Sequence, residues 1–245
     1  MAAQRGHDVT LVASQQLGGK LRWEAELPGR HEYRNVLSWM ERQLRDAGAK
    51  IEFGRITATH DVLALKPESV ILATGSSLRP PTGIEGGSSV RDWDGHLRTN
   101  CFDTTAVLFD MDHSAATYAV ADALTDRYKK LVLLTPRTQI ARDVNYCSAI
   151  GIYRRLYHAD AEIIVAAEPV SLQDGVLAWR NAFTGRVREI AKVGLFLWST
   201  PRIANDALAQ PLRDVGVDAR LVGDCLAPRN LLCAIHEGEA AAIAI

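Results

Sequence analysis

The Gly223-Asp224 pair near the end of the chain is the residue pattern best suited to holding a small ligand. It directly follows the apolar run Ala219–Val222, so the sequence places a carboxylate at the tip of a strand. Such a carboxylate can accept two hydrogen bonds from a diol. The alternative is that Asp224 caps the final helix, a role that Asp fills well at about 1 kcal/mol.

Two earlier stretches contain glycines that suit the same task. Gly18-Gly19, followed by Lys20-Leu21, would let the backbone approach a ribose or pyrophosphate, because glycine accepts positive φ and has no Cβ. Ala73-Thr74-Gly75 ends an apolar run with small residues, as a backbone that packs under a cofactor requires. A plain turn is the alternative for the first stretch, and a tight exit from a strand is the alternative for the second.

Other kinds of active site have little support in the sequence. The serines lie in no GxSxG, the histidines have no HxxxH or HExxH spacing, and no P-loop occurs. We therefore predict no catalytic and no metal-ligating residue. His113 is expected to be an exposed loop histidine. The cysteines match no CxxC pair and are expected to be structural or incidental, with Cys225 beside the Gly-Asp turn the one whose thiol pKa a helix start could lower: Cys101, Cys147, Cys225 and Cys233.

Charge and hydropathy exclude two classes of partner. The net charge is -1, from 28 basic and 29 acidic residues, and neither sign forms a long block, so neither nucleic acid nor an anionic membrane is expected. The longest apolar stretches are far shorter than the ~20 residues that span a bilayer. The first residues have no apolar core behind their basic side chain, which predicts no secretory signal and a cytoplasmic location.

Apolar runs alternate with helical patterns along the chain, which predicts an α/β fold with largely parallel strands. The first cycle is expected to contain one helix, at 31–47, and strands at 8–12, 50–53, 61–65 and 69–73. A turn-rich passage around Pro80-Pro81 precedes the second cycle. That cycle has strands at 105–109, 131–135, 161–167 and 193–198, helices at 114–124 and 147–157, and a hairpin of 176–182 with 186–190. The strand 219–222 and a final helix return to the first pattern.

A set of motifs resembles the nucleotide-binding part of the trimethylamine dehydrogenase and 2,4-dienoyl-CoA reductase family. The motifs are Gly6–Val12, Leu17–Leu21, Leu27–Arg30, Ile71–Ser76, and Val222-Gly223-Asp224 with Ala227-Pro228-Arg229. The resemblance implies two Rossmann-like domains of the glutathione-reductase type, the second inserted in the first. These would be an FAD/ADP-binding-like domain of residues 1–80 plus 206–245, and an NAD(P)-binding-like domain of residues 81–205.

The resemblance also implies a site and a role. It places cofactor contacts at Gly18, Gly19, Lys20, Leu21, Ala73, Thr74, Gly75, Gly223, Asp224 and Pro228. The cofactor would be FAD or ADP, and the chain would be the nucleotide-binding portion or subunit of a flavin-dependent oxidoreductase, in which the flavin does the chemistry. Its partner would be the barrel portion or subunit that carries FMN and an iron-sulfur cluster, and an oligomer is expected. Leu108–His113 and Leu134–Pro136 are more similar to the amine dehydrogenase branch, which is known for holding ADP or FAD.

The chain departs from the family pattern at its start. The family's first domain opens with a strand, a GxGxxG turn and a helix, whereas this chain matches from the end of that helix and contains no GxGxxG. The first domain is thus expected to be truncated, with two strands lacking a ladder partner. Ala13-Ser14 stand where an acidic residue usually grips the adenosine ribose. Tight binding of FAD or ADP by this chain alone is therefore not expected.

The second domain departs from the pattern as well. Asp110–Ser114 has no glycine and carries two carboxylates at the turn where a dinucleotide would bind, so NAD(P) binding is not expected. Asp112 or Ser114 is expected to cap the following helix. Two alternatives to the flavoprotein hypothesis follow from these departures: a noncatalytic assembly module that has lost dinucleotide binding, and a truncated gene fragment.

Overall fold

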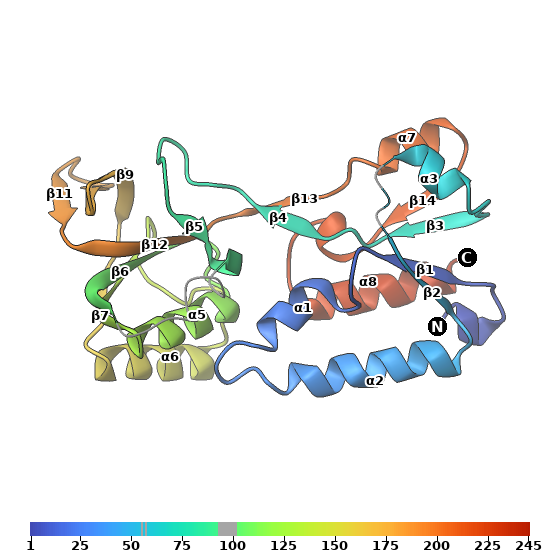
Figure 1. Cartoon of the computed structure of the whole chain (residues 1–245), viewed down its shortest axis with the longest axis horizontal. Helices are drawn as coiled ribbons and strands as arrows, with labels where there is room; N and C mark the ends of the chain where they lie inside the picture. The colour runs from blue at the N-terminus through green and yellow to red at the C-terminus, as the bar shows by residue number, and fades with distance from the viewer. Residues whose placement is uncertain (55, 57, 93–101) are drawn as a thin grey trace. The chain divides into compact units, whose positions relative to one another are not determined.

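The computed structural model describes residues 1–54, 56, 58–92 and 102–245, and the chain divides into two compact units (Figure 1). Unit 1 comprises Met1–Ala25, Glu32–Ser77 and Arg202–Ile245, and unit 2 comprises Glu26–His31 and Leu78–Pro201. The expected assignment of an FAD/ADP-like and an NAD(P)-like domain, with their boundaries, stays a prediction. The expectations for Cys101 concern a residue outside the described part of the chain.

The centre of unit 2 is a five-stranded parallel sheet in the order β5-β12-β6-β7-β8. Its strands are β5 (Ser88–Ser89), β12 (Val193–Ser199), β6 (Phe102–Asp110), β7 (Tyr128–Leu134) and β8 (Glu162–Ile164). Continuous apolar runs form the central strands because both faces of this sheet are covered. Val107 and Leu108, whose side chains alternate between the two faces, are both fully buried.

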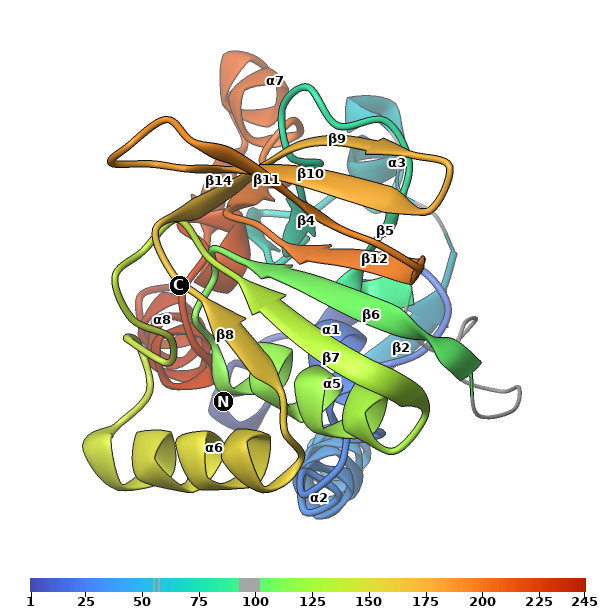
Figure 2. The same ribbon diagram turned by 90° about the vertical axis from the view of Figure 1, so that its left-hand side faces the viewer.

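Two layers cover the sheet of unit 2. Helices α5 (Ala115–Thr125) and α6 (Tyr146–His158) lie on one face, and the antiparallel sheet of β9 (Ala167–Gln173), β10 (Val176–Asn181) and β11 (Val187–Ile190) lies on the other (Figure 2). Trp179 of β10 packs in one core with Phe109 and Phe196 of the parallel sheet. β10 and β11 pair in the antiparallel direction, so the predicted hairpin is confirmed.

The single strand predicted at 161–167 is wrong. The chain forms β8, turns at Ala166 with a φ of +50°, and enters the other sheet at Ala167. A left-handed residue redirects the backbone between two sheets, and the apolar run Ile163–Ala167 does not reveal such a change.

Unit 1 contains parallel strands in two separate pairs. β1 (Thr10–Ala13) pairs with β2 (Lys50–Phe53), and β3 (Ser69–Leu72) pairs with β14 (Asp218–Leu221). A third pair joins β4 (Ser76–Leu78) to β13 (Arg202–Ala204). Within the described residues each of these three sheets has two strands. The expected truncation of the first domain stays a prediction.

The helices of unit 1 are α1 (Gly19–Glu24), α2 (Tyr33–Asp46), α3 (Thr59–Leu63), α7 (Ala209–Asp214) and α8 (Leu231–Ile243). The strand predicted at 61–65 is wrong, since α3 occupies this segment. The Ala58 N–H donates to Asp61 Oδ2 at 3.0 Å, so a carboxylate in the first turn starts a helix where the apolar residues suggest a strand. Short 3-10 turns occur at Ala3–Arg5 (η1), Val90–Asp92 (η2, in unit 2) and Gly223–Cys225 (η3).

The apolar contacts of unit 1 include a small core under β3 and β14. Leu72 and Ala219 of these strands pack with Leu212 of α7 and Cys225 of η3. In the described part of the chain, no helix combines the length and apolarity needed to cross a membrane.

Candidate functional site

The glycine-rich and small-residue stretches singled out in the sequence meet at Asp224 in unit 1. Ser76 Oγ donates to Asp224 Oδ2 at 2.9 Å, and Lys20 Nζ lies 3.9 Å from the same oxygen. The backbone N–H of Arg229 donates to Asp224 Oδ1 at 3.0 Å. The segments that follow β1, β3 and β14 thus converge on one carboxylate, as expected for the carboxyl ends of strands in an α/β unit.

Arg202 of β13 also contacts Asp224, and sequence reasoning did not predict it. Its Nη1 donates to Asp224 Oδ2, and its Nη2 donates to the carbonyl of Arg229 at 2.8 Å. The Arg202 side chain is only 8% exposed. A lone arginine just after Pro201 gives no signal of this role, because its partner lies more than twenty positions away in the sequence.

The surroundings of Asp224 favour its ionised form. Burial opposes ionisation, but the Arg229 N–H and the charges of Arg202 and Lys20 outweigh it, so the pKa of Asp224 is below its ordinary value. An ionised carboxylate is an acceptor of hydrogen bonds and has no proton to give.

Asp224 does not cap the final helix, so that alternative is wrong. Asp224 lies in η3, whereas the N-cap of α8 is Asn230, whose Oδ1 accepts from the N–H of Cys233 at 3.0 Å. The carboxylate of Asp224 instead fixes the loop between η3 and α8 through Arg229.

The glycines near Asp224 fall into two groups. A Cβ on Gly18 would come within 2.3 Å of Leu37 Cδ2, and a Cβ on Gly223 would lie 3.1 Å from Ala234 Cβ. Packing inside unit 1 therefore accounts for these two glycines. Gly19 and Gly75 also have positive φ, but an added Cβ would meet nothing within 4 Å at either position. Packing therefore does not account for glycine at these two positions.

Thr74 and Cys225 take part in the internal packing of unit 1. Thr74 Oγ1 lies 2.5 Å from the carbonyl oxygen of Asn205 and 3.0 Å from Cys225 Sγ. Cys225 is 1% exposed, and its thiol also donates to the Asn205 carbonyl at 3.3 Å. This environment indicates a structural cysteine. The other predicted contact residues are Ala73, which is exposed, and Leu21 and Pro228, which are half-buried.

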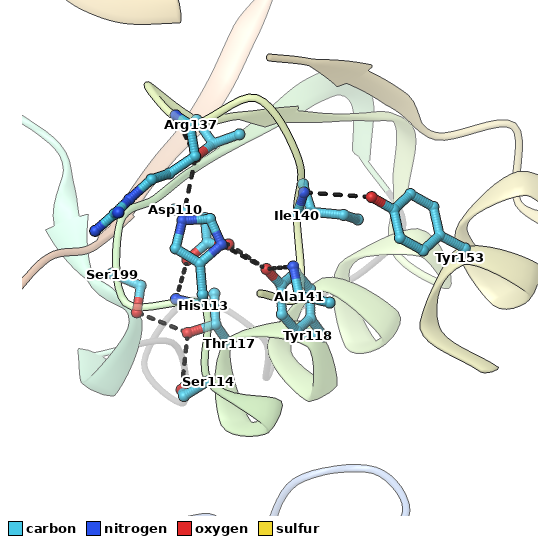
Figure 3. A network of polar contacts seen from close by, with 11 residues as sticks. Asp110, His113, Ser114, Thr117, Tyr118, Arg137, Ile140, Ala141, Tyr153 and Ser199 are labelled. Atoms are coloured by element: carbon cyan, nitrogen blue, oxygen red, sulfur yellow. Dashed lines mark hydrogen bonds and ion pairs between the residues drawn. The ribbon is translucent and has the colours of Figure 1, made fainter. Parts of the chain in front are cut away.

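The turn between β6 and α5 in unit 2 is filled by its own side chains (Figure 3). His113 is 1% exposed and Asp110 is 0% exposed, so the prediction that His113 is an exposed loop histidine is wrong. The His113 N–H donates to Asp110 Oδ1 at 2.9 Å, and Tyr118 Oη donates to Asp110 Oδ2 at 2.5 Å. His113 Nδ1 lies 3.5 Å from Asp110 Oδ2 and 3.3 Å from Tyr118 Oη.

The same network fixes the loop after β7. The Ala141 N–H donates to Tyr118 Oη at 2.5 Å, and Thr135 Oγ1 lies 3.5 Å from His113 Nε2. Burial and then the charge of Asp110 raise the pKa of Tyr118, which keeps its hydroxyl a donor to the carboxylate. Burial also raises the pKa of Asp110, although His113 and Tyr118 oppose that effect. The sequence gives no clear signal of this network, because Thr135 and Ala141 lie more than twenty residues beyond their partners.

The expected side-chain cap of α5 does not form. Ser114 occupies the N-cap position, but its hydroxyl lies 3.2 Å from Thr117 Oγ1 and makes no cap hydrogen bond to the backbone. Thr117 Oγ1 in turn lies 2.7 Å from Ser199 Oγ. The first turn of the helix is therefore tied to β12 through side chains.

No protein-family model matches the chain, but comparison with curated proteins finds relatives over nearly its whole length. It is 25% identical over 248 residues to an NADH oxidase of Thermoanaerobacter brockii, covering 97% of this chain and 37% of that protein. It is also 25% identical over 284 residues to an N,N-dimethylglycine/sarcosine dehydrogenase of Chromohalobacter salexigens, covering 97% of this chain and 40% of that protein. The chain is homologous to the C-terminal nucleotide-binding region of the trimethylamine dehydrogenase family. It spans about two fifths of the length of these curated relatives.

Solved structures confirm the predicted fold. Histamine dehydrogenase from Rhizobium sp. 4-9 matches with a TM-score of 0.85 at 23% identity, covering 98% of this chain and 41% of that one. Thioredoxin reductase from Lactococcus lactis matches with a TM-score of 0.75 at 16% identity, covering 99% of this chain and 91% of that one. The predicted α/β class with two Rossmann-like domains is therefore confirmed.

Proposed function

We propose that this chain is the nucleotide-binding part of a flavin-dependent oxidoreductase, in which unit 1 holds FAD or ADP. The observation that carries the proposal is the convergence of Lys20, Ser76 and Arg229 on the ionised carboxylate of Asp224. Homology over nearly the whole chain to enzymes named NADH oxidase and N,N-dimethylglycine/sarcosine dehydrogenase supports it.

Each residue of the site would have a binding task. The backbone at Gly19 and Gly75 is open and left-handed, which suits a close approach of a ribose or pyrophosphate. Asp224 would accept hydrogen bonds from a diol, and the Lys20 ammonium would lie beside a ligand of negative charge. A bound flavin supplies the redox chemistry, so this chain needs to orient the cofactor and shield it from water.

The remaining portion of such an oxidoreductase would complete the catalytic unit. We propose a barrel portion with FMN and an iron-sulfur cluster, on the same or a separate chain, because the chain spans about two fifths of its relatives. Substrate would meet that portion. Unit 2 is not assigned a dinucleotide, since buried side chains fill its β6–α5 turn.

Isothermal titration with FAD and with ADP tests the proposal on the purified chain and on Asp224→Asn. We expect saturable binding at one site, weakened about 10- to 100-fold in the variant, because hydrogen bonds to a charged group contribute about 1.5–3 kcal/mol. Asp218→Asn, which changes an exposed carboxylate on β14, is the control and should bind like the wild type. Equal binding by wild type and Asp224→Asn would refute a site at Asp224.

A noncatalytic assembly module is the second candidate, and two observations favour it. Protein donors engage both oxygens of Asp224, and the Asp110–His113–Tyr118 network closes the turn of unit 2. This candidate predicts a colourless protein that releases no nucleotide on denaturation, takes up none in the titration, and elutes as a stable complex with a purified barrel-bearing portion. Saturable FAD or ADP binding at Asp224 rules it out.

A further inference from the structure

Asp224 is held by donors from several parts of unit 1. Oδ2 accepts from Ser76 Oγ and Arg202 Nη1, and Oδ1 accepts from the Arg229 N–H. Only 16% of the Asp224 side chain is exposed. Most hydrogen-bond acceptor positions of this carboxylate are therefore used by donors within the protein.

The count of acceptor positions limits what else Asp224 can bind. A carboxylate offers about four lone-pair positions, and three of them are used here. A diol that donates two hydrogen bonds would find one position open. One of the three protein donors must therefore leave for a diol to bind in full.

Arg202 is the donor best placed to leave. Ser76 is buried and contacts Asp224 through a short side chain, and the Arg229 donor belongs to the backbone. Arg202 reaches Asp224 from β13 through a long side chain, and a second hydrogen bond holds its guanidinium on the Arg229 carbonyl. A planar guanidinium can bridge the carboxylate and the carbonyl in this way when no ligand is bound.

We propose that Arg202 is an internal competitor for the ligand-binding carboxylate of unit 1. Its guanidinium occupies Asp224 Oδ2 and must move away before the hydroxyls of a ribose or ribityl chain can bind there. The inference rests on the proposed binding of FAD or ADP by unit 1. It would give a physical reason for the weak binding that we expect of the free chain, in addition to the absence of a GxGxxG turn.

The test compares FAD binding by wild type, Arg202→Met, and the double variant Arg202→Met/Asp224→Asn, using isothermal titration. We expect Arg202→Met to bind FAD about 10- to 100-fold more tightly, since it removes one charged hydrogen bond that competes with the ligand. The double variant should lose this gain, because it lacks the carboxylate. Arg220→Met, which removes a guanidinium paired with Asp218 on β14, should bind like the wild type.

Arg202→Met leaves Asp224 without its guanidinium partner, so folding is checked by circular dichroism, and Arg202→Gln serves as a second variant with a neutral donor. A gain in the Gln variant also supports the inference. Binding by the wild type with no gain in either folded variant overturns the inference and leaves the proposed function intact. A gain that persists in the double variant also overturns it. No FAD binding by any folded protein overturns the proposed function together with the inference.

Discussion

Two glycines that resemble each other in sequence have different physical roles. Gly18 has a φ of +98° and lies against Leu37, whereas the neighbouring Gly19 has open space where a Cβ would be. From the sequence, both were predicted to contact a cofactor. The sequence could not separate them, because the contact with Leu37 depends on how α2 packs.

Gly18→Ala is therefore expected to destabilise unit 1 by about 2–4 kcal/mol, from left-handed backbone strain and from overpacking against Leu37. Gly48→Ala is the matched control, since Gly48 also has a positive φ but an added Cβ meets nothing within 4 Å. It should cost only the backbone part, about 1–2 kcal/mol. Urea unfolding measures the loss of stability in both variants. Equal losses in the two variants would show that Leu37 does not restrict position 18.

Burial of Asp110 gives a second prediction for a single residue. The pKa of Asp110 is raised in the folded protein, mainly by burial. The protonated form of Asp110 therefore contributes stability at low pH, and this contribution is lost as pH rises through the pKa of the folded state. The unfolded value is about 3.9. Relative to Asp110→Asn, the wild type should thus lose stability as pH increases above about 4.

Thermal unfolding of both proteins across this pH range provides the measurement. Asp103→Asn is the control with the opposite sign, because a hydrogen bond and the charge of Lys129 lower the pKa of exposed Asp103. The wild type should lose its advantage over Asp103→Asn as pH falls below about 4. A difference between wild type and Asp110→Asn that does not change with pH would contradict the burial of an ionisable Asp110.

The helices of the two units differ in how their first turns are capped. Asn230 caps α8 with a 3.0 Å hydrogen bond to the Cys233 N–H, whereas Ser114 stands at the start of α5 without one. Asn230→Ala should cost about 1 kcal/mol of stability. Asn145→Ala, which removes the 2.9 Å cap of α6, should cost a similar amount and serves as the comparison in unit 2. Chemical unfolding that gives no loss for Asn230→Ala would refute the cap.

The elements of the fold differ in how far the sequence predicts them. β6 and β7 could be predicted because strands covered on both faces are continuous apolar runs. α1 was not predicted, since it is six residues long and begins at a glycine. The segment 61–65 was assigned to a strand because its apolar residues do not reveal the local cap of Asp61, which starts α3.

The residues of the candidate site also differ in how far the sequence predicts them. Asp224 and the stretch around Gly75 could be predicted, since each follows a strand and has residue types suited to a ligand. Arg202 could not, because its partner is set by the pairing of β13 with β4 and by the loop after η3. The burial of His113 was missed because a histidine in a turn is ordinarily exposed, and only the fold brings Thr135 and Tyr118 to its ring.

At the scale of the whole molecule, we propose that unit 1 holds the nucleotide and unit 2 does not. The proposed difference rests on the contacts of Lys20 and Ser76 with Asp224 in unit 1, and on the buried side chains of Asp110 and His113 in the β6–α5 turn of unit 2. The relatives named NADH oxidase and N,N-dimethylglycine/sarcosine dehydrogenase match over nearly the whole chain, so this similarity does not distinguish the two units. The two units must therefore be tested separately within one intact chain.

Amide hydrogen exchange with and without saturating ADP tests this claim most directly, because it reports on both units in the same experiment. We predict that ADP slows exchange in segments 18–21, 73–76 and 223–229, and leaves 110–118 and 135–141 unchanged. Slower exchange at the β6–α5 turn, or no change in either unit at an ADP concentration that saturates binding, would contradict the account.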